Sequence, residues 1–171
     1  MSHASDGNGD ARYDRALLLH GAKRNSVLTL TEVRQYGADS FGDPDYVKLY
    51  GMFPAQWYER GIRLLGRTAV ECTRDELADR MGRDIAAVAA RMRSVQNCIV
   101  VDPFSGSCNT LFWILRHLPK SQGLAFESDA LVHSLTANNI ASLGTNIELN
   151  HGDYLSVLPS LNVEPDTTIV A

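Results

Sequence analysis

The second half of the chain alternates short apolar runs with helical patterns, and this alternation limits its fold more than any other feature. The run "CIVVD" (98–102) is continuous and apolar, as expected of a strand buried on both faces of a sheet. Further strands are predicted at "GLAFE" (123–127), "NIELNHGDY" (146–154) and "DTTIVA" (166–171). Strands that alternate with helices form parallel sheets with right-handed crossovers. We therefore expect an α/β domain over residues 95–171.

Helices are predicted between these strands. The segment "NTLFWILRHL" (109–118) places apolar residues on one face, and Pro119 ends it. The next helix follows Asp129, a suitable N-cap, and stops at Gly144, a suitable C-terminal residue. A short helical link is predicted at "LSVLPSL" (155–161).

The first half of the chain divides into a tail and an extension. Residues 1–25 are polar at their start and carry no clear pattern, and we expect a disordered tail. Residues 26–94 are predicted to form a helical N-terminal extension. Within it, "RTAVE" (67–71) is predicted as a short extended piece.

The clearest helical segment of the extension is 73–95. Thr73 followed by Glu76 matches a capping box. Apolar residues then recur at spacings of three and four, which predicts one apolar stripe. Its members are Leu77, Met81, Ile85, Val88 and Met92. Gly82 and Asp84 suggest a break, so two helices are an alternative to one.

Composition excludes several classes of protein. Hydrophobic residues make up 44% of the 171 residues and charged residues 21%, which is typical of a soluble globular domain. No apolar run reaches the roughly 20 residues of a membrane span, and the N-terminus has no secretory signal pattern. Three cysteines without a C-x-x-C pair argue against a disulfide framework or zinc site and favour the cytoplasm. The net charge of −4 argues against strong general affinity for phosphate backbones.

An acidic residue follows each of the first three predicted strands. Asp102, Glu127 and Asp153 stand at or just after the strand ends. Ligands of open parallel sheets bind beyond the carboxyl ends of the strands, so we expect these carboxylates around one site. A nucleoside with a cationic arm fits them, because Glu127 can accept the ribose hydroxyls and Asp153 the adenine amino group. Asp102 supplies negative potential for an amino or sulfonium group, and Gly106 lets the backbone approach the ligand.

Several of these residues also have a purely structural interpretation. Asp102 could cap the following helix, and Asp153 after a glycine could be a turn residue. Asn109 and Thr110 are expected to begin a helix, whose free N–H groups could also face a cofactor carboxylate. Cys108 is interpreted as a packed small residue rather than a nucleophile.

Three segments together resemble a known family. They are "DPFSGSCNT" (102–110), "AFESD" (125–129) and "HGDY" (151–154). They resemble the cofactor half of the class I S-adenosylmethionine-dependent methyltransferases, and the first loop resembles that of the nucleic-acid amino-methyltransferases. The upstream segment "LYGMFPAQWYERGIRLLGRTAVECTRDELADRM" (49–81) resembles trimethylguanosine synthase-type enzymes, which methylate the exocyclic amine of guanine. The resemblance covers about residues 46–171.

The resemblance implies a fold, a cofactor and a substrate. The fold is a Rossmann-like parallel sheet, represented by its first four strands, behind the helical extension. The implied cofactor is S-adenosylmethionine. The implied substrate is an exocyclic amino group of a base in RNA, and guanine is the favoured base. The implied cofactor contacts are Thr73, Asp102, Phe104, Ser105, Gly106, Asn109, Thr110, Glu127, Ser128, Asp153 and Tyr154. No metal site is expected.

An aromatic group in the extension has two interpretations. It is either core packing or a platform on which a substrate base stacks. For the second interpretation the substrate-binding residues are Trp57, Tyr58 and Arg60.

The sequence departs from the family pattern in two places. Cys108 stands where the family usually has a second glycine, and its side chain is expected to narrow the room for the methionine part. The family's catalytic loop, a polar or small residue followed by Pro-Pro-aromatic, comes after the fourth strand and lies beyond Ala171. The catalytic residues are therefore unknown, and we expect a chain truncated before that loop. Alternatively, a partner or self-association covers the unpaired sheet edge.

Two other functions remain open from the sequence. A DNA adenine or small-molecule methyltransferase would use the same cofactor half. A non-enzymatic regulator would bind DNA by a helix-turn-helix and sense a ligand with its sheet. Ala78, Gly82 and Val88 have the spacing of that motif, and Arg83 and Arg91 would contact DNA.

Overall fold

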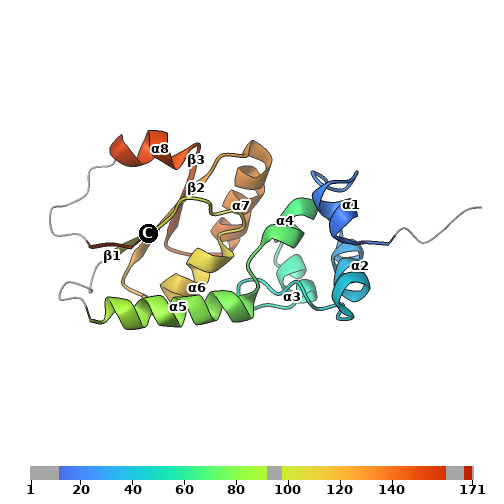
Figure 1. The fold of residues 1–171 in the computed structure, drawn as a ribbon, viewed down its shortest axis with the longest axis horizontal. Helices are drawn as coiled ribbons and strands as arrows, with labels where there is room; N and C mark the ends of the chain where they lie inside the picture. Colours follow the sequence, from blue (N-terminus) through green and yellow to red (C-terminus); the bar gives the residue numbers. More distant parts are fainter. Residues whose placement is uncertain (1–11, 92–97, 161–167, 171) are drawn as a thin grey trace, which may run out of the picture.

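The computed structural model describes residues 12–91, 98–160 and 168–170, in which a helical part lies beside an α/β part (Figure 1). The helical part contains α1 (Arg15–Leu19), α2 (Leu30–Phe41), α3 (Pro54–Glu59) and α4 (Gly66–Glu71), and α5 (Asp75–Ala89) leads to the sheet. The α/β part contains β1 (Cys98–Asp102), α6 (Asn109–His117), β2 (Gln122–Glu127), α7 (Ala130–Leu143), β3 (Ile147–His151), α8 (Tyr154–Val157), the 3-10 turn η1 (Leu158–Ser160) and β4 (Thr168–Val170).

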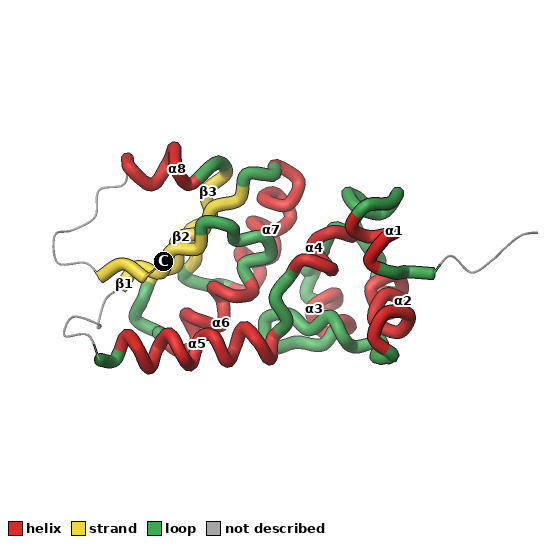
Figure 2. The backbone as a smooth tube through the Cα atoms, in the orientation of Figure 1, coloured by secondary structure: helices red, strands yellow, loops and turns green. Residues whose placement is uncertain are grey.

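The four strands form one parallel sheet in the order β3-β2-β1-β4 (Figure 2). The predicted α/β class with a parallel sheet is therefore confirmed. In the register of the sheet, Asp102 pairs with Ala125, and Glu127 pairs with His151. This register brings the carboxyl ends of β1, β2 and β3 to the same edge, where the sequence places its acidic residues.

Alternate residues of β1 serve opposite faces of the sheet. Val100 packs with Leu111 and Ile114 of α6 in one buried cluster, which α5 and α7 also join. Val101 belongs to a second cluster that contains Phe126 and is covered by residues of α8 and η1. A continuous apolar strand is thus buried on both sides, as its sequence predicts.

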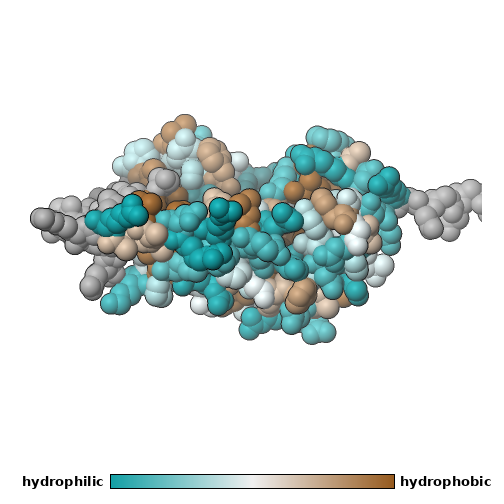
Figure 3. All heavy atoms as spheres, turned by 60° about the horizontal axis from the view of Figure 1, so that its bottom comes forward, coloured by the Kyte–Doolittle hydropathy of each residue, from teal (hydrophilic) through white to brown (hydrophobic). Residues whose placement is uncertain are grey.

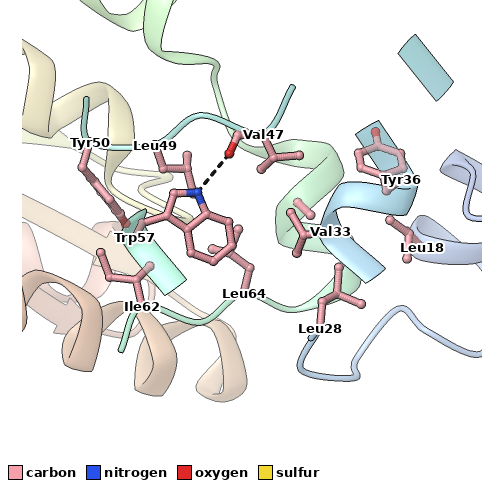
Figure 4. Close-up of a cluster of buried hydrophobic side chains, with 11 residues drawn as sticks. Leu18, Leu28, Val33, Tyr36, Val47, Leu49, Tyr50, Trp57, Ile62 and Leu64 are labelled. Carbon is pink, nitrogen blue, oxygen red and sulfur yellow. Dashed lines mark hydrogen bonds between the residues drawn. The ribbon is translucent and has the colours of Figure 1, made fainter. Parts of the chain in front are cut away.

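The core of the helical part is built around Trp57 (Figure 4). Its side chain is 0% exposed, and its Nε1–H donates to the backbone oxygen of Val47 at 3.0 Å. Phe112 of α6 and Leu143 of α7 pack against this same cluster. The cores of the two parts are therefore in direct contact.

The predicted disordered tail is wrong for residues 12–25. These residues include α1, which Asp14 caps by accepting from the backbone N–H of Leu17 at 3.0 Å. Leu18 of this helix is fully buried, so hydrophobic packing holds it in place. Residues 1–11 lie outside the described residues.

Helix α5 corrects two predictions. It is one continuous helix, and its N-cap is Arg74 without a side-chain bond, so the Thr73–Glu76 capping box does not form. Gly82 does not break the helix but lets it approach α6 closely. A Cβ atom at Gly82 would lie 2.8 Å from the backbone oxygen of Trp113.

The apolar stripe predicted for α5 is largely exposed. Leu77 is 52% exposed, Met81 38% and Val88 60%, whereas the small residues Ala78 and Gly82 are buried. Close helix packing favours small residues at the contact, and this preference overrides the apolar periodicity. One face of the molecule accordingly shows hydrophobic atoms scattered among hydrophilic ones (Figure 3). Because α5 is one continuous helix that packs against α6, it does not form the helix-turn-helix that the sequence offered as an alternative.

Glu32 holds together the start of the helical part. Its carboxylate accepts from Lys23 Nζ at 2.5 Å, Tyr13 Oη at 2.8 Å and the backbone N–H of Thr29 at 2.8 Å. Burial alone would raise the pKa of Glu32, but these donors together lower it from 4.5 to about 2. The ionised carboxylate is therefore strongly favoured in the folded protein.

We expect Glu32→Gln to lower the free energy of unfolding at pH 7 by roughly 2 kcal/mol. Because the pKa of Glu32 is lower in the folded chain, its contribution is complete above about pH 5 and fades toward pH 2. Urea unfolding at pH 7, 5 and 3 tests this, with the exposed Glu59→Gln as control. A difference from the wild type that stays constant over this range would contradict it.

Candidate functional site

A cavity of about 790 Å³ lies at the carboxyl ends of the strands. Asp102, Glu127 and Asp153 all line it, so the three acidic residues predicted at neighbouring strand ends surround one space. Residues from α4 and α5 line the same cavity. Its volume is within the range of small-molecule sites, about 300–1,000 Å³.

Most predicted cofactor contacts line this cavity. They are Thr73, Asp102, Phe104, Ser105, Gly106, Thr110, Glu127, Ser128, Asp153 and Tyr154. Four predicted site residues are not among its lining residues, namely Asn109, Trp57, Tyr58 and Arg60. The strand–loop–helix pattern thus predicted many of the residues that line the cavity, whereas the residues expected to bind a substrate do not line it.

The loop after β1 is held at its middle by hydrogen bonds to β2 and α7. The backbone N–H and the hydroxyl of Ser105 both donate to the backbone oxygen of Phe126 at 3.0 Å. Thr136 of α7 donates its hydroxyl to the Gly106 oxygen at 2.8 Å. Gly106 has φ +48°, and a Cβ there would meet nothing within 4 Å. The backbone of this loop is therefore fixed and open to the cavity.

Asp102 is a half-buried acid for which the structure shows one hydrogen-bond donor. Its Oδ1 accepts the backbone N–H of Phe104 at 3.1 Å. Burial raises the pKa of Asp102, the Phe104 amide partly opposes this, and the negative charge of Glu127 adds to the increase. A cation bound in the cavity would favour the ionised form of this carboxyl.

The other two acids are each tied to the following turn. Glu127 Oε1 accepts the backbone N–H of Asp129 at 2.7 Å. Asp153 Oδ1 accepts the N–H of Leu155 at 3.0 Å and caps α8, so its structural interpretation holds as well. These bonds fix each carboxylate while it lines the cavity.

Two aromatic rings stand at the same edge. Phe104 is 80% exposed, and its ring meets Tyr154 edge to face, with centroids 5.4 Å apart. An exposed ring beside a cavity offers apolar area to a flat ligand. Both residues were predicted as cofactor contacts.

Helix α4 supplies a cavity wall that the sequence did not reveal. The missed lining residues of this wall are Arg67, Thr68, Glu71 and Cys72. The sequence analysis predicts an extended piece at 67–71, which is wrong because these residues belong to α4. A helix of one or two turns has too few residues to show a clear apolar periodicity. Burial raises the pKa of the Cys72 thiol to about 12, so it is no nucleophile at neutral pH.

Asn109 joins the two parts of the molecule instead of facing the cavity. It is 1% exposed, and its Oδ1 accepts the backbone N–H of Tyr50 at 2.8 Å. Its Nδ2 donates to the backbone oxygen of Thr73 at 2.7 Å and to Asp75 Oδ1 at 2.9 Å. Asn109 thereby fixes the position of Thr73, the residue through which α4 leads to α5.

Cys108 does not narrow the cavity as the sequence analysis expected. The residue has φ 58° and is fully buried, and its side chain belongs to the hydrophobic cluster beneath the sheet. Burial raises the pKa of its thiol to about 12. The departure from glycine therefore places a side chain in the left-handed region, which costs about 1 kcal/mol, without filling the ligand space.

The base-stacking interpretation of the aromatic group does not hold for Trp57. Trp57 is wholly enclosed in the core, so it cannot stack on a base (Figure 4). The guanidinium of Arg63 lies 3.6 Å from the ring centroid of Tyr58 and covers it. Arg60 is exposed, with Nη1 3.9 Å from Met52 Sδ. Of the two interpretations, core packing holds for Trp57.

No group of three or more His, Cys, Asp or Glu side chains in residues 12–91, 98–160 and 168–170 is arranged to hold a metal ion. Every helix among the described residues is too short or too polar to cross a membrane. No family model, curated protein or solved structure matches this chain.

Proposed function

We propose that the cavity binds S-adenosylmethionine and that the chain is the cofactor-binding part of a methyltransferase. The observation that carries the proposal is the convergence of Asp102, Glu127 and Asp153 on one cavity from three strand ends. The strand order β3-β2-β1-β4 is also the order expected for the first four strands of a Rossmann-like methyltransferase sheet. The loop between β1 and α6 contributes most of its predicted contacts to the same cavity.

The charge of the cavity favours this ligand over a dinucleotide. Carboxylates outnumber cations in its described lining. The carboxylates are those of Glu71, Asp102, Glu127 and Asp153, and the cation is that of Arg67. Such a lining attracts a positively charged ligand and repels a diphosphate. A nucleoside that carries a sulfonium and an amino group meets this requirement.

The three acidic residues and the first turn of α6 each have a chemical task in the proposal. Glu127 accepts hydrogen bonds from the ribose hydroxyls, and Asp153 accepts one from the adenine amino group. Asp102 stabilises the positive amino or sulfonium group, which in turn favours its ionised form. The first turn of α6, with Thr110, offers N–H groups to the carboxylate of the ligand.

The methyl acceptor is proposed from the resemblance to trimethylguanosine synthase-type enzymes. The proposed acceptor is an exocyclic amino group of a base in RNA, and guanine is the favoured base. The bound cofactor supplies an electrophilic methyl group, and the protein contributes mainly by placing the amine in line with it. Met81, Ile85 and Ile114 also line the cavity and give it apolar surface for contact with a flat base.

Removing the Glu127 carboxylate should weaken the cofactor site. A hydrogen bond to a charged acceptor contributes about 1.5–3 kcal/mol, so Glu127→Ala should weaken S-adenosylhomocysteine binding tenfold to hundredfold. Isothermal calorimetry measures this, with Glu148→Ala as control because Glu148 is exposed on β3 and does not line the cavity. A folded wild type that gives no binding signal would refute the proposal.

Asp102→Asn should stabilise the ligand-free protein at pH 7 while weakening ligand binding about tenfold. Since the pKa of Asp102 is raised on folding, its ionised form costs stability above the unfolded pKa, and this cost disappears at low pH. Asparagine keeps the acceptor for the Phe104 amide. Thermal unfolding at pH 7 and pH 4 should show a gain that shrinks at the lower pH. A loss of stability at pH 7 would contradict this account.

A further inference from the structure

One peptide group of the cavity loop is held from the helical part of the molecule. Ser105, Gly106 and Ser107 all line the cavity, and β2 and α7 hold the first two by the hydrogen bonds described above. The next peptide group lies between Ser107 and Cys108. Its carbonyl oxygen accepts from the hydroxyl of Tyr50, which is the one donor to this oxygen among the residues that the structure describes.

Tyr50 lies at the tip of a tight turn in the helical part. The backbone groups of Leu49 and Met52 bond to each other in both directions, at 3.1 and 2.9 Å. The two residues between them, Tyr50 and Gly51, have φ values of 55° and 77°. Turns of this kind favour glycine or asparagine at both central positions, so a tyrosine there is strained. Such strain persists only where the surrounding contacts impose it.

The contacts that impose this conformation lead to the cavity loop and to α6. The Tyr50 side chain is 3% exposed, and its ring meets Phe112 of α6 edge to face, with centroids 5.3 Å apart. The backbone N–H of Tyr50 donates to Asn109 Oδ1 at 2.8 Å, while its hydroxyl donates to the Ser107 oxygen. Burial raises the pKa of Tyr50 well above its ordinary value, and a hydrogen bond with Asn139 opposes this only in part. The hydroxyl therefore keeps its proton and remains a donor.

The peptide group that Tyr50 holds determines the shape of the loop. Its N–H, that of Cys108, donates to the Ser105 oxygen at 2.6 Å. The carbonyl and the N–H of one planar peptide group turn together, so a carbonyl that loses its donor can rotate and take the N–H away from Ser105. Cys108 has φ 58°, an unfavourable conformation for a residue with a side chain, which favours such a rotation. Tyr50 opposes it.

We propose that Tyr50 is a positioning residue that holds the cavity loop in the conformation that accepts the nucleoside ligand. Tyr50 does not line the cavity, so it acts through the peptide group between Ser107 and Cys108 and not by contact with the ligand. This inference rests on the proposed function, because it assigns the loop to the cofactor. Affinity for the cofactor then depends on how the helical part docks against the loop.

The first measurement compares Tyr50→Phe with Tyr36→Phe. Both tyrosines are 3% exposed and belong to the same hydrophobic cluster, and they lie at opposite ends of it (Figure 4). Each variant keeps the ring and removes a buried hydroxyl, but only Tyr50 bonds to the loop. In calorimetry, Tyr50→Phe should weaken S-adenosylhomocysteine binding about tenfold, and Tyr36→Phe should leave it within about twofold of the wild type.

The second measurement is amide hydrogen exchange of the ligand-free proteins. In Tyr50→Phe the Cys108 amide should exchange about tenfold faster than in the wild type, because the peptide group opens locally. The Val100 amide, in the middle of β1, reports wider unfolding of the sheet. It should change no more in Tyr50→Phe than in Tyr36→Phe. A role in stability alone would accelerate both amides alike.

Three results would overturn the role of Tyr50. They are unchanged exchange at Cys108, unchanged affinity despite faster exchange, and equal effects of the two variants on both measurements. A folded wild type that binds no S-adenosylhomocysteine would instead overturn the proposed function. The exchange measurement needs no ligand, so it would separate these cases by showing whether Tyr50 holds the loop.

Discussion

The shape of the site depends on the hydrogen bonds that the buried Asp75 carboxylate accepts. Asp75 is 7% exposed and accepts from Gly51 N–H at 2.9 Å, Asn109 Nδ2 at 2.9 Å and Trp113 Nε1 at 2.7 Å. A buried charge is tolerated when hydrogen bonds satisfy it, and it is costly once a partner is lost. These donors come from the helical part and from α6, so satisfying one charge fixes both parts relative to each other. Helix α4, which precedes Asp75 in the chain, is thereby held beside the cavity that the strand ends also line.

Asp102 shows the contrasting case. It is also withdrawn from water, but the structure gives it a single backbone donor from Phe104 and the negative charge of Glu127 nearby. The two carboxylates therefore differ in how many hydrogen-bond donors the fold supplies to them. Asp75 has its donors within the fold and acts as a structural link. Asp102 has no cationic side chain among its stated partners, so a positive group on a ligand would favour its ionised form.

The sequence predicted the strands and the place of the site because both follow from local pattern and one rule of topology. Continuous apolar runs mark buried parallel strands, and such sheets bind ligands at their carboxyl ends, which locates Asp102 and Glu127. Prediction from the sequence failed where contacts between distant segments determine how a side chain is placed. Nothing local shows that Trp57 is enclosed by segments distant in the chain, or that Asn109 turns toward Tyr50. The exposed apolar stripe of α5 was mispredicted for the same reason, because packing against α6 sets which face of α5 is buried.

Both parts of the chain contribute charged side chains to the cavity. The sheet supplies carboxylates at the ends of β1 and β2 and just beyond β3, and the helical part supplies Arg67 and Glu71 together with the hydroxyl of Thr68. A ligand that needs both signs can be held only when α4 stays in place over the strand ends. Arg63 supports this arrangement, because its backbone N–H and oxygen both bond to Asn139 of α7, at 3.0 and 2.8 Å. The helical part therefore forms a wall of the cavity together with the strand ends.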